Sequence, residues 1–179
     1  MNIGFDLDKV FINYPPFIPG KLVDWIYKKH DHILAYRYPS KTEQIIRGLS
    51  HGSLLRPPIK ENVAFLAELA KTNSHKRYLI SGRFGFLENI TKNLLKKHHL
   101  TELFCGLEFN FKNKQPHIFK DAAIKKHKID IYIDDDLPLL EFLAQRNPKV
   151  KFFWLTKKPK KNVQENLKSI KRLEEIFSK

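Results

Sequence analysis

The sequence is poor in cysteine and has no long apolar run. Cys105 is the only cysteine, so an internal disulfide is excluded, as is typical of a reducing compartment. No run of about 18 apolar residues occurs, so no membrane span is expected. Acids interrupt the N-terminal apolar run almost at once, so this run does not resemble a signal peptide. These absences favour a cytoplasmic protein without a membrane segment.

Acidic residues are also few in comparison with basic ones. The chain has 33 Lys and Arg against 19 Asp and Glu, a formal net charge of +14. Such a surplus favours anionic partners, such as phosphorylated metabolites, nucleotides or nucleic acid. The lysines are scattered, however, which also fits a chain that uses lysine as its default surface residue. The densest run, at residues 157–161, is more typical of a solvated turn than of a nucleic-acid patch.

The most informative stretch is residues 2–12, where two carboxylates interrupt a short apolar run. Asp6 and Asp8 are spaced i and i+2, which places both side chains on one face of a strand. Two charges in an apolar segment are unfavourable unless they are compensated. A hard divalent cation with oxygen ligands would compensate them. The stretch therefore indicates a cation site, and the alternative is a strand end whose acids face water.

Polar residues end two further apolar runs. Residues 77–80 are followed by Ser81, Gly82 and Arg83, and residues 129–133 are followed by three consecutive acids. Between these runs, Lys120 lies at an expected helix start. Ligands of parallel sheets bind beyond the carboxyl ends of the strands, so we expect these groups to converge.

Strand-like and helical patterns alternate along the chain, which predicts a parallel sheet covered by helices on both faces. A strand expected at residues 103–105 would bury Cys105 as a structural cysteine. A stripe of apolar residues from Val163 to Phe177 predicts a C-terminal helix. The remaining strand-like runs lie near residues 3–7, 77–80, 129–133 and 151–155, and further helical patterns lie near residues 59–70, 84–94 and 137–145.

Residues 13–56 are too many for a simple crossover between the first two strands. Ser40 and Glu43 have the spacing of a helix capping box, and Leu22 to Ile26 form an amphipathic stretch. The segment is therefore predicted to be a small, mainly helical insertion. Its arginines and aromatics, including Arg37 and Tyr38, could hold a phosphate and stack a base. The alternative is that the aromatics form the insertion's own core.

An acid pair, a hydroxyl, a lysine and an acid cluster, each at an element boundary, occur here in the order seen in the haloacid dehalogenase (HAD) superfamily. The chain resembles a HAD phosphatase over roughly residues 1 to 156. The resemblance implies an α/β fold, with a Rossmann-like parallel sheet, helices on both faces and a small helical cap inserted after the first strand. The core domain would comprise residues 1–12 and 57–179, and the cap residues 13–56.

The resemblance also implies catalytic roles. Asp6 would be the nucleophile that forms an aspartyl-phosphate, and Asp8 would protonate the leaving group and then activate water. Ser81 would donate to the phosphoryl oxygens. Lys120 would neutralise the nucleophile and the phosphate, with Lys114 as the alternative.

The implied cofactor is Mg²⁺. Its ligands would be Asp6, the backbone carbonyl of Asp8 and an acid of the last cluster. Asp135 best matches the metal ligand of the family, and Asp134 is second, with a supporting role. Asp136 would only cap the helix that follows. No other cofactor is expected.

The expected substrate contacts are Gly82 and Arg83, with Arg37 and Tyr38 from the cap. Lys9 stands where many family members have glycine, and its charge could alter specificity. These features predict a Mg²⁺-dependent phosphomonoester hydrolase acting on a nucleotide or another small phosphorylated metabolite, similar to the small 5′(3′)-nucleotidases. The competing prediction is a basic nucleic-acid-binding protein, or a phosphatase of nucleic-acid ends, on a HAD scaffold. The sequence gives no indication of oligomeric state.

Overall fold

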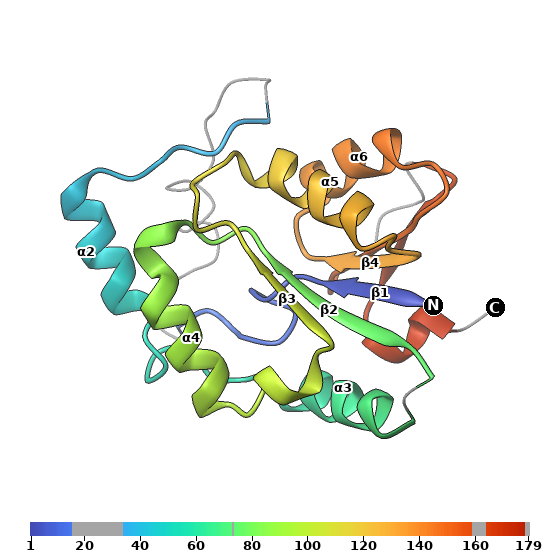
Figure 1. Cartoon of the computed structure of the whole chain (residues 1–179), viewed down its shortest axis with the longest axis horizontal. Coiled ribbons are helices and arrows are strands. Elements are labelled where there is room, and N and C mark those ends of the chain that lie inside the picture. The colour runs from blue at the N-terminus through green and yellow to red at the C-terminus, as the bar shows by residue number, and fades with distance from the viewer. Residues whose placement is uncertain (16–33, 73, 159–163, 178–179) are drawn as a thin grey trace.

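The computed structural model describes residues 1–15, 34–72, 74–158 and 164–177. Within these ranges the chain forms a six-stranded sheet with the order β3-β2-β1-β4-β5-β6, in which all neighbouring strands are parallel (Figure 1). The strands are β1 (Asn2–Phe5), β2 (Lys76–Ser81), β3 (Gly106–Phe109), β4 (Ile131–Asp134), β5 (Lys151–Leu155) and β6 (Leu167–Ile170).

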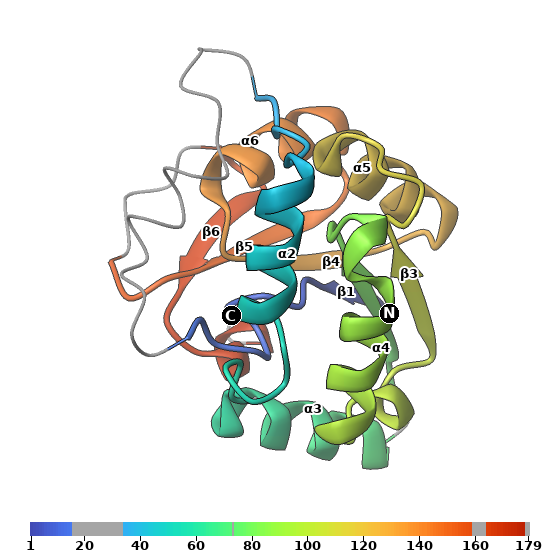
Figure 2. The ribbon, with the colours of Figure 1, turned by 90° about the vertical axis from the view of Figure 1, so that its left-hand side faces the viewer.

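Helices cover both faces of this sheet. Helices α5 (Pro116–Lys126) and α6 (Leu137–Arg146) pack on one face, and α3 (Lys60–Thr72) and α4 (Glu88–Lys97) pack on the other (Figures 1 and 2). The buried side chains of the two faces form separate clusters. The α5 and α6 cluster contains Ile80 and Tyr132, and the α3 and α4 cluster contains Phe5. The predicted α/β fold, a parallel sheet with helices on both faces, is confirmed.

The register of the strands brings the predicted polar residues to one edge of the sheet. Phe5 at the end of β1 pairs with Leu79 of β2 and Ile133 of β4. Asp6 therefore leaves β1 level with the ends of its two neighbours, where Ser81 and Asp134 are the last strand residues. The site is built where three parallel strands end side by side, as expected for a sheet of this kind.

The predicted C-terminal helix is wrong. Strand β6 and a short 3₁₀ helix, Leu173–Phe177, replace it in the described residues, and Val163 lies outside them. Leu167 and Ile170 belong to the clusters on opposite faces of the sheet. A spacing of three residues places side chains on opposite faces of a strand but on one face of a helix, so the apolar pattern alone could not separate the two.

The strand expected at residues 103–105 begins later in the chain. Thr101–Leu103 is a 3₁₀ helix, and β3 starts at Gly106. Cys105 is exposed, so the prediction of a buried structural cysteine is wrong.

The insertion after β1 contains helix α2 (Lys41–Ser50) in its described part. The predicted capping box is present, because Ser40 and Glu43 each bond the other's backbone N–H. Residues 16–33, including the stretch from Leu22 to Ile26, lie outside the described residues. The division into core and cap stays a prediction. In the described parts of the chain, no helix has both the length and the apolar character needed to cross a membrane.

Candidate active site

Asp6, Lys120 and Asp134 form a buried ionic cluster at the carboxyl edge of the sheet. The Lys120 Nζ donates to Asp6 Oδ1 and to Asp134 Oδ2, each at 2.6 Å. Asp134 Oδ2 also accepts from the Tyr132 hydroxyl at 3.1 Å. Lys120 lies in the second turn of α5 and does not open the helix as predicted, because α5 begins at Pro116. This position still brings its ammonium to both carboxylates.

The burial of this cluster shifts the pKa values of its members. Burial, aided by the charges of Asp134 and Asp8, raises the pKa of Asp6 above its usual range, and Lys120 opposes that rise. Burial alone would lower the pKa of Lys120, but Asp134 and Asp6 raise it well above its usual value. Lys120 is therefore held as a cation between the two carboxylates.

Asp135 completes a group of carboxylates that fits a divalent cation. One oxygen from each of Asp6, Asp134 and Asp135 lies within 4.8 Å of the others. Such an arrangement of hard oxygen donors suits Mg²⁺. Asp135 also pairs with Lys9, whose Nζ lies 3.0 Å from its Oδ2. Lys9 has a left-handed φ of 57°, which explains why glycine would be favoured at this position.

Asp136 occupies the N-cap position of α6, but its side chain makes no capping hydrogen bond there. Instead, it accepts from the hydroxyl of Tyr36 at 2.7 Å. The expectation that Asp136 only caps the helix is therefore wrong. Its carboxylate joins the segment before α2 to the edge of the sheet.

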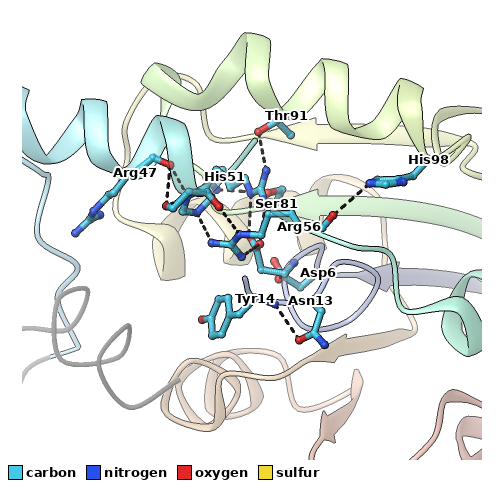
Figure 3. Close-up of polar contacts among 12 residues, drawn as sticks. Asp6, Asn13, Tyr14, Arg47, His51, Arg56, Ser81, Thr91 and His98 are labelled. Atoms are coloured by element: carbon cyan, nitrogen blue, oxygen red, sulfur yellow. Dashed lines mark hydrogen bonds and ion pairs between the residues drawn. The ribbon is translucent and has the colours of Figure 1, made fainter. Parts of the chain in front are cut away.

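Two buried arginines, Arg83 and Arg56, donate hydrogen bonds to Asp8. The Arg83 Nε and Nη2 donate to the two oxygens of Asp8 at 2.8 and 2.7 Å, and the Arg56 Nη1 donates at 3.1 Å. Burial would raise the pKa of Asp8, but Arg83 and Arg56 together hold it well below its usual range. Arg83 Nη1 also donates to Thr91 at 3.2 Å (Figure 3). Arg83, predicted as a substrate contact, thus contacts the second acid of the pair.

Ser81, the last residue of β2, and Gly82, which follows it, also lie at the site. Ser81 is buried, and its Oγ lies 3.4 Å from the backbone nitrogen of Arg83. A Cβ on Gly82 would lie 3.2 Å from Pro116 and 3.4 Å from Lys120. The absence of a side chain at Gly82 therefore lets α5 bring Lys120 close to the end of β2.

A cavity of about 160 Å³ opens onto these groups, with Asp6, Asp8 and Lys120 in its wall. Aromatic residues from several segments also line it, namely Tyr14, Tyr36, Phe84 and Phe86. A charged end and an aromatic wall suit a ligand with an anionic group and an apolar or aromatic part.

Five of the predicted residues do not line this cavity, namely Lys9, Ser81, Arg37, Tyr38 and Lys114. Arg37 is exposed and pairs with Glu43, while Tyr38 packs edge-on against Phe84 and Phe86. Lys114 is exposed, and its backbone N–H donates to Asn110. The structure thus brings Lys120, and not its rival, to the acid cluster.

Arg56 and His51 are parts of the site that the sequence pattern does not predict. Both residues lie in the predicted insertion of residues 13–56. Both are buried, at 2% and 4% exposure, and the Nη2 of Arg56 lies 3.0 Å from the His51 Nε2. No spacing in the sequence could have indicated these contacts, since Arg56 and Asp8 are 48 positions apart.

The sequence matches no protein-family model, and no curated protein matches it. Solved structures do resemble it. A haloacid dehalogenase-like hydrolase from Streptococcus pneumoniae is 16% identical with a TM-score of 0.58, over 87% of this chain and 84% of that chain. A HAD family enzyme from Bacteroides thetaiotaomicron, an aspartate-to-alanine mutant in complex with magnesium and inorganic phosphate, is also 16% identical. Its TM-score is 0.55, over 90% of this chain and 96% of that chain.

A chain of the Pnkp1/Rnl/Hen1 RNA repair complex is 14% identical with a TM-score of 0.51. The match covers 86% of this chain but only 41% of that one. Together, these neighbours confirm the resemblance at the level of the fold: the chain has the fold of the HAD superfamily hydrolases.

Proposed function

We propose that this protein is a Mg²⁺-dependent phosphomonoester hydrolase in which Asp6 is the nucleophile. The observation that carries this proposal is the contact of Asp6 with Lys120 inside a cluster of three carboxylates that opens onto a cavity. A carboxylate can attack a phosphate only if cations suppress the repulsion between them. Lys120 supplies one such cation, and the oxygens of Asp6, Asp134 and Asp135 provide a place for a second.

The proposed reaction has two halves. Asp6 attacks the phosphorus, the ester P–O bond breaks, and the leaving oxygen takes a proton from water, because the contacts of Arg83 and Arg56 keep Asp8 ionised. Asp8 then takes a proton from water, which attacks the aspartyl-phosphate and releases Asp6 and inorganic phosphate. Ser81 and Lys120 hold the phosphoryl oxygens, and bound Mg²⁺ would supply charge neutralisation between Asp6 and the phosphoryl group.

We propose a nucleotide or another small phosphorylated metabolite as the substrate. The aromatic wall formed by Tyr14, Tyr36, Phe84 and Phe86 supports this class, because flat rings can stack on such side chains. The likeness to small 5′(3′)-nucleotidases and the cytoplasmic location belong to the same proposal. Turnover by the purified protein of a panel of nucleotides, sugar phosphates and phosphate monoesters, with Mg²⁺ present, tests it. If the protein hydrolyses no member of this panel, the proposal is contradicted.

A phosphatase of nucleic-acid ends is the second candidate. The net charge of +14 favours it, and one structural neighbour belongs to an RNA repair complex. Oligonucleotides with a 5′ or 3′ phosphate in the same panel separate the candidates. Preferential turnover of these ends, with a KM that rises steeply with salt, would favour the second candidate.

The metal ligands can be ranked by mutation. We expect activity to require Mg²⁺ and Asp135→Ala to raise the Mg²⁺ concentration for half-maximal activity more than Asp136→Ala does. The reason is that Asp135 belongs to the carboxylate cluster, whereas Asp136 bonds Tyr36. Titration of activity with Mg²⁺ after chelator treatment measures both effects. Full activity in excess EDTA would contradict the metal requirement, and the reverse order would reassign the ligand.

The predicted cap residues should affect substrate choice more than the chemical step. Tyr38 packs on the cavity residues Phe84 and Phe86, so Tyr38→Ala should raise KM for a nucleotide-sized substrate. Arg37→Ala should do the same, roughly tenfold, if Arg37 makes a charge-assisted bond to that substrate. Activity on a small generic ester should change little. Equal losses on both substrates, measured as kcat and KM, would instead indicate a role in folding or catalysis.

A further inference from the structure

Helix α2 turns its apolar side chains away from the rest of the protein. Ile45, Ile46 and Leu49 are between 63 and 72% exposed, whereas Arg47 is buried. Residues three or four positions apart share one face of a helix, so the three apolar residues form a single stripe and Arg47 lies on the other side. Figure 2 shows α2 at the surface of the molecule, on the side turned toward the viewer. An apolar helix face normally packs against another surface, so this stripe lacks the cover that its composition calls for.

The apolar surface continues into the turns that follow α2. The Gly52 N–H donates to the Leu49 carbonyl at 3.2 Å, and the Leu55 N–H donates to the Gly52 carbonyl at 3.0 Å. These turns keep the chain beside the end of the helix, and they leave Leu54 88% exposed and Leu55 40% exposed. Five of the nine large apolar side chains that are exposed in the described parts of the chain therefore belong to residues 45–55. Apolar exposure concentrated in this way marks an interaction surface, whereas scattered exposure does not.

The charge of this surface indicates what covers it. Arg47 is the only Lys, Arg, Asp or Glu among residues 44–55, and it is buried. Helices α3, α4 and α5 each expose at least one lysine after the first turn, whereas the only lysine of α2 is Lys41, at its first residue. Nucleic acid, an acidic protein or an anionic membrane would bind to exposed cations. A stripe without exposed charge fits a partner surface that is itself apolar and uncharged.

We propose that α2 and the turns after it form the contact between two copies of this chain, related by a two-fold axis. Each copy carries a net charge of +14, so two copies repel and can approach closely only through a face without exposed cations. The stripe meets this requirement, and two-fold pairing is the commonest arrangement of identical chains. Two such helices packed side by side would bury each other's apolar stripe. The contact does not depend on the hydrolase function proposed above.

Sedimentation velocity of the full chain tests the contact. The wild-type protein is expected to dimerise at micromolar concentration, and more strongly as salt is added, because salt screens the repulsion between the copies. Leu49→Lys should raise the dissociation constant of the dimer roughly 100-fold, since a two-fold axis makes each substitution act twice. The matched control Ile118→Lys places the same charge on an apolar residue of α5 that is 47% exposed, and it should leave the dissociation constant unchanged. An equal effect of the two substitutions would overturn the proposal.

A pair of opposite charges identifies the face that is used. Leu49 lies in the middle of the stripe, so a two-fold axis through the stripe brings this residue close to its own counterpart. Leu49→Lys and Leu49→Glu should each be monomeric, and a mixture of the two should recover at least about tenfold of the lost affinity, because opposite charges then meet. If the wild-type protein dimerises and the mixture stays monomeric, the copies meet through another face and the proposal is overturned.

Two other results would also overturn it. A wild-type protein that stays monomeric up to roughly 100 µM would show that the stripe does not join two copies. Binding of the monomer to vesicles of an anionic phospholipid, weakened by salt and lost in Leu49→Glu, would assign the stripe to a membrane surface instead. Circular dichroism checks that the variants are folded, as expected for substitutions of exposed side chains.

Discussion

Asp6→Asn is expected to abolish turnover and to leave the fold intact. An amide has nearly the shape of a carboxylate but is a poor nucleophile, so kcat should fall by roughly 10⁴-fold or more. The amide oxygen can still accept from one of the two donors of Asp6, which are the Lys120 Nζ at Oδ1 and the backbone N–H of Asp8 at Oδ2, although the amide NH2 cannot accept from the other. Steady-state kinetics on the best substrate of the panel measures the loss, and thermal unfolding checks the fold.

Asp130→Asn is the matched control for this variant. Asp130 is an exposed acid before β4, at the other end of the sheet, where it accepts from the N–H of Asn2. The same chemical change there should leave kcat and KM unchanged. Near wild-type activity in Asp6→Asn would show that Asp6 is not the nucleophile.

Lys120→Met is expected to reduce both activity and stability. The substitution leaves the carboxylates of Asp6 and Asp134 buried without the cation that both contact at 2.6 Å. Breaking a buried ion pair by removing one partner costs about 3–5 kcal/mol. Activity should fall by roughly 10²–10³-fold, because the transferred phosphoryl group also loses a positive charge. Denaturant unfolding in the presence of EDTA measures the stability without compensation by a bound metal.

Lys114→Met separates Lys120 from its rival. Lys114 is exposed, so its substitution should change neither the unfolding free energy nor kcat appreciably. A large loss of activity in Lys114→Met, with Lys120→Met active, would reverse the assignment. A loss of activity without any loss of stability in Lys120→Met would mean that the buried contacts with Asp6 and Asp134 are weaker than their geometry indicates.

The sheet and the edge where the site lies could be predicted because the informative residues stand next to short apolar runs. Asp6, Ser81 and Asp134 each follow or end a strand, so the parallel topology alone brings them together. The order of these residues along the chain carried the resemblance to the HAD superfamily. The sequence pattern alone could not identify Lys120 as the lysine of the site, since many lysines are present and only the packing shows which one contacts the acids.

The remaining features depend on contacts that have no local signature. The sequence pattern predicts a helix where strand β6 lies, because Leu167 and Ile170 are apolar residues three positions apart, a spacing common to both structures. His51 and Arg56 follow a helix end and precede a proline pair, and nothing in that neighbourhood points to Asp8. Such residues come together only when separate segments pack against each other, so a search for sequence motifs does not detect them.

The two lysines that contact the acid cluster bear on whether the protein must bind a metal before it can fold. Lys120 lies between Asp6 and Asp134, and Lys9 pairs with Asp135, so the chain's own cations offset the repulsion among these carboxylates. In structural zinc sites, by contrast, binding of the metal supplies the free energy of folding. Here the polypeptide can fold first, and the proposed Mg²⁺ can bind afterwards. The supply of Mg²⁺ would then determine the fraction of the protein that is active, and not the fraction that is folded.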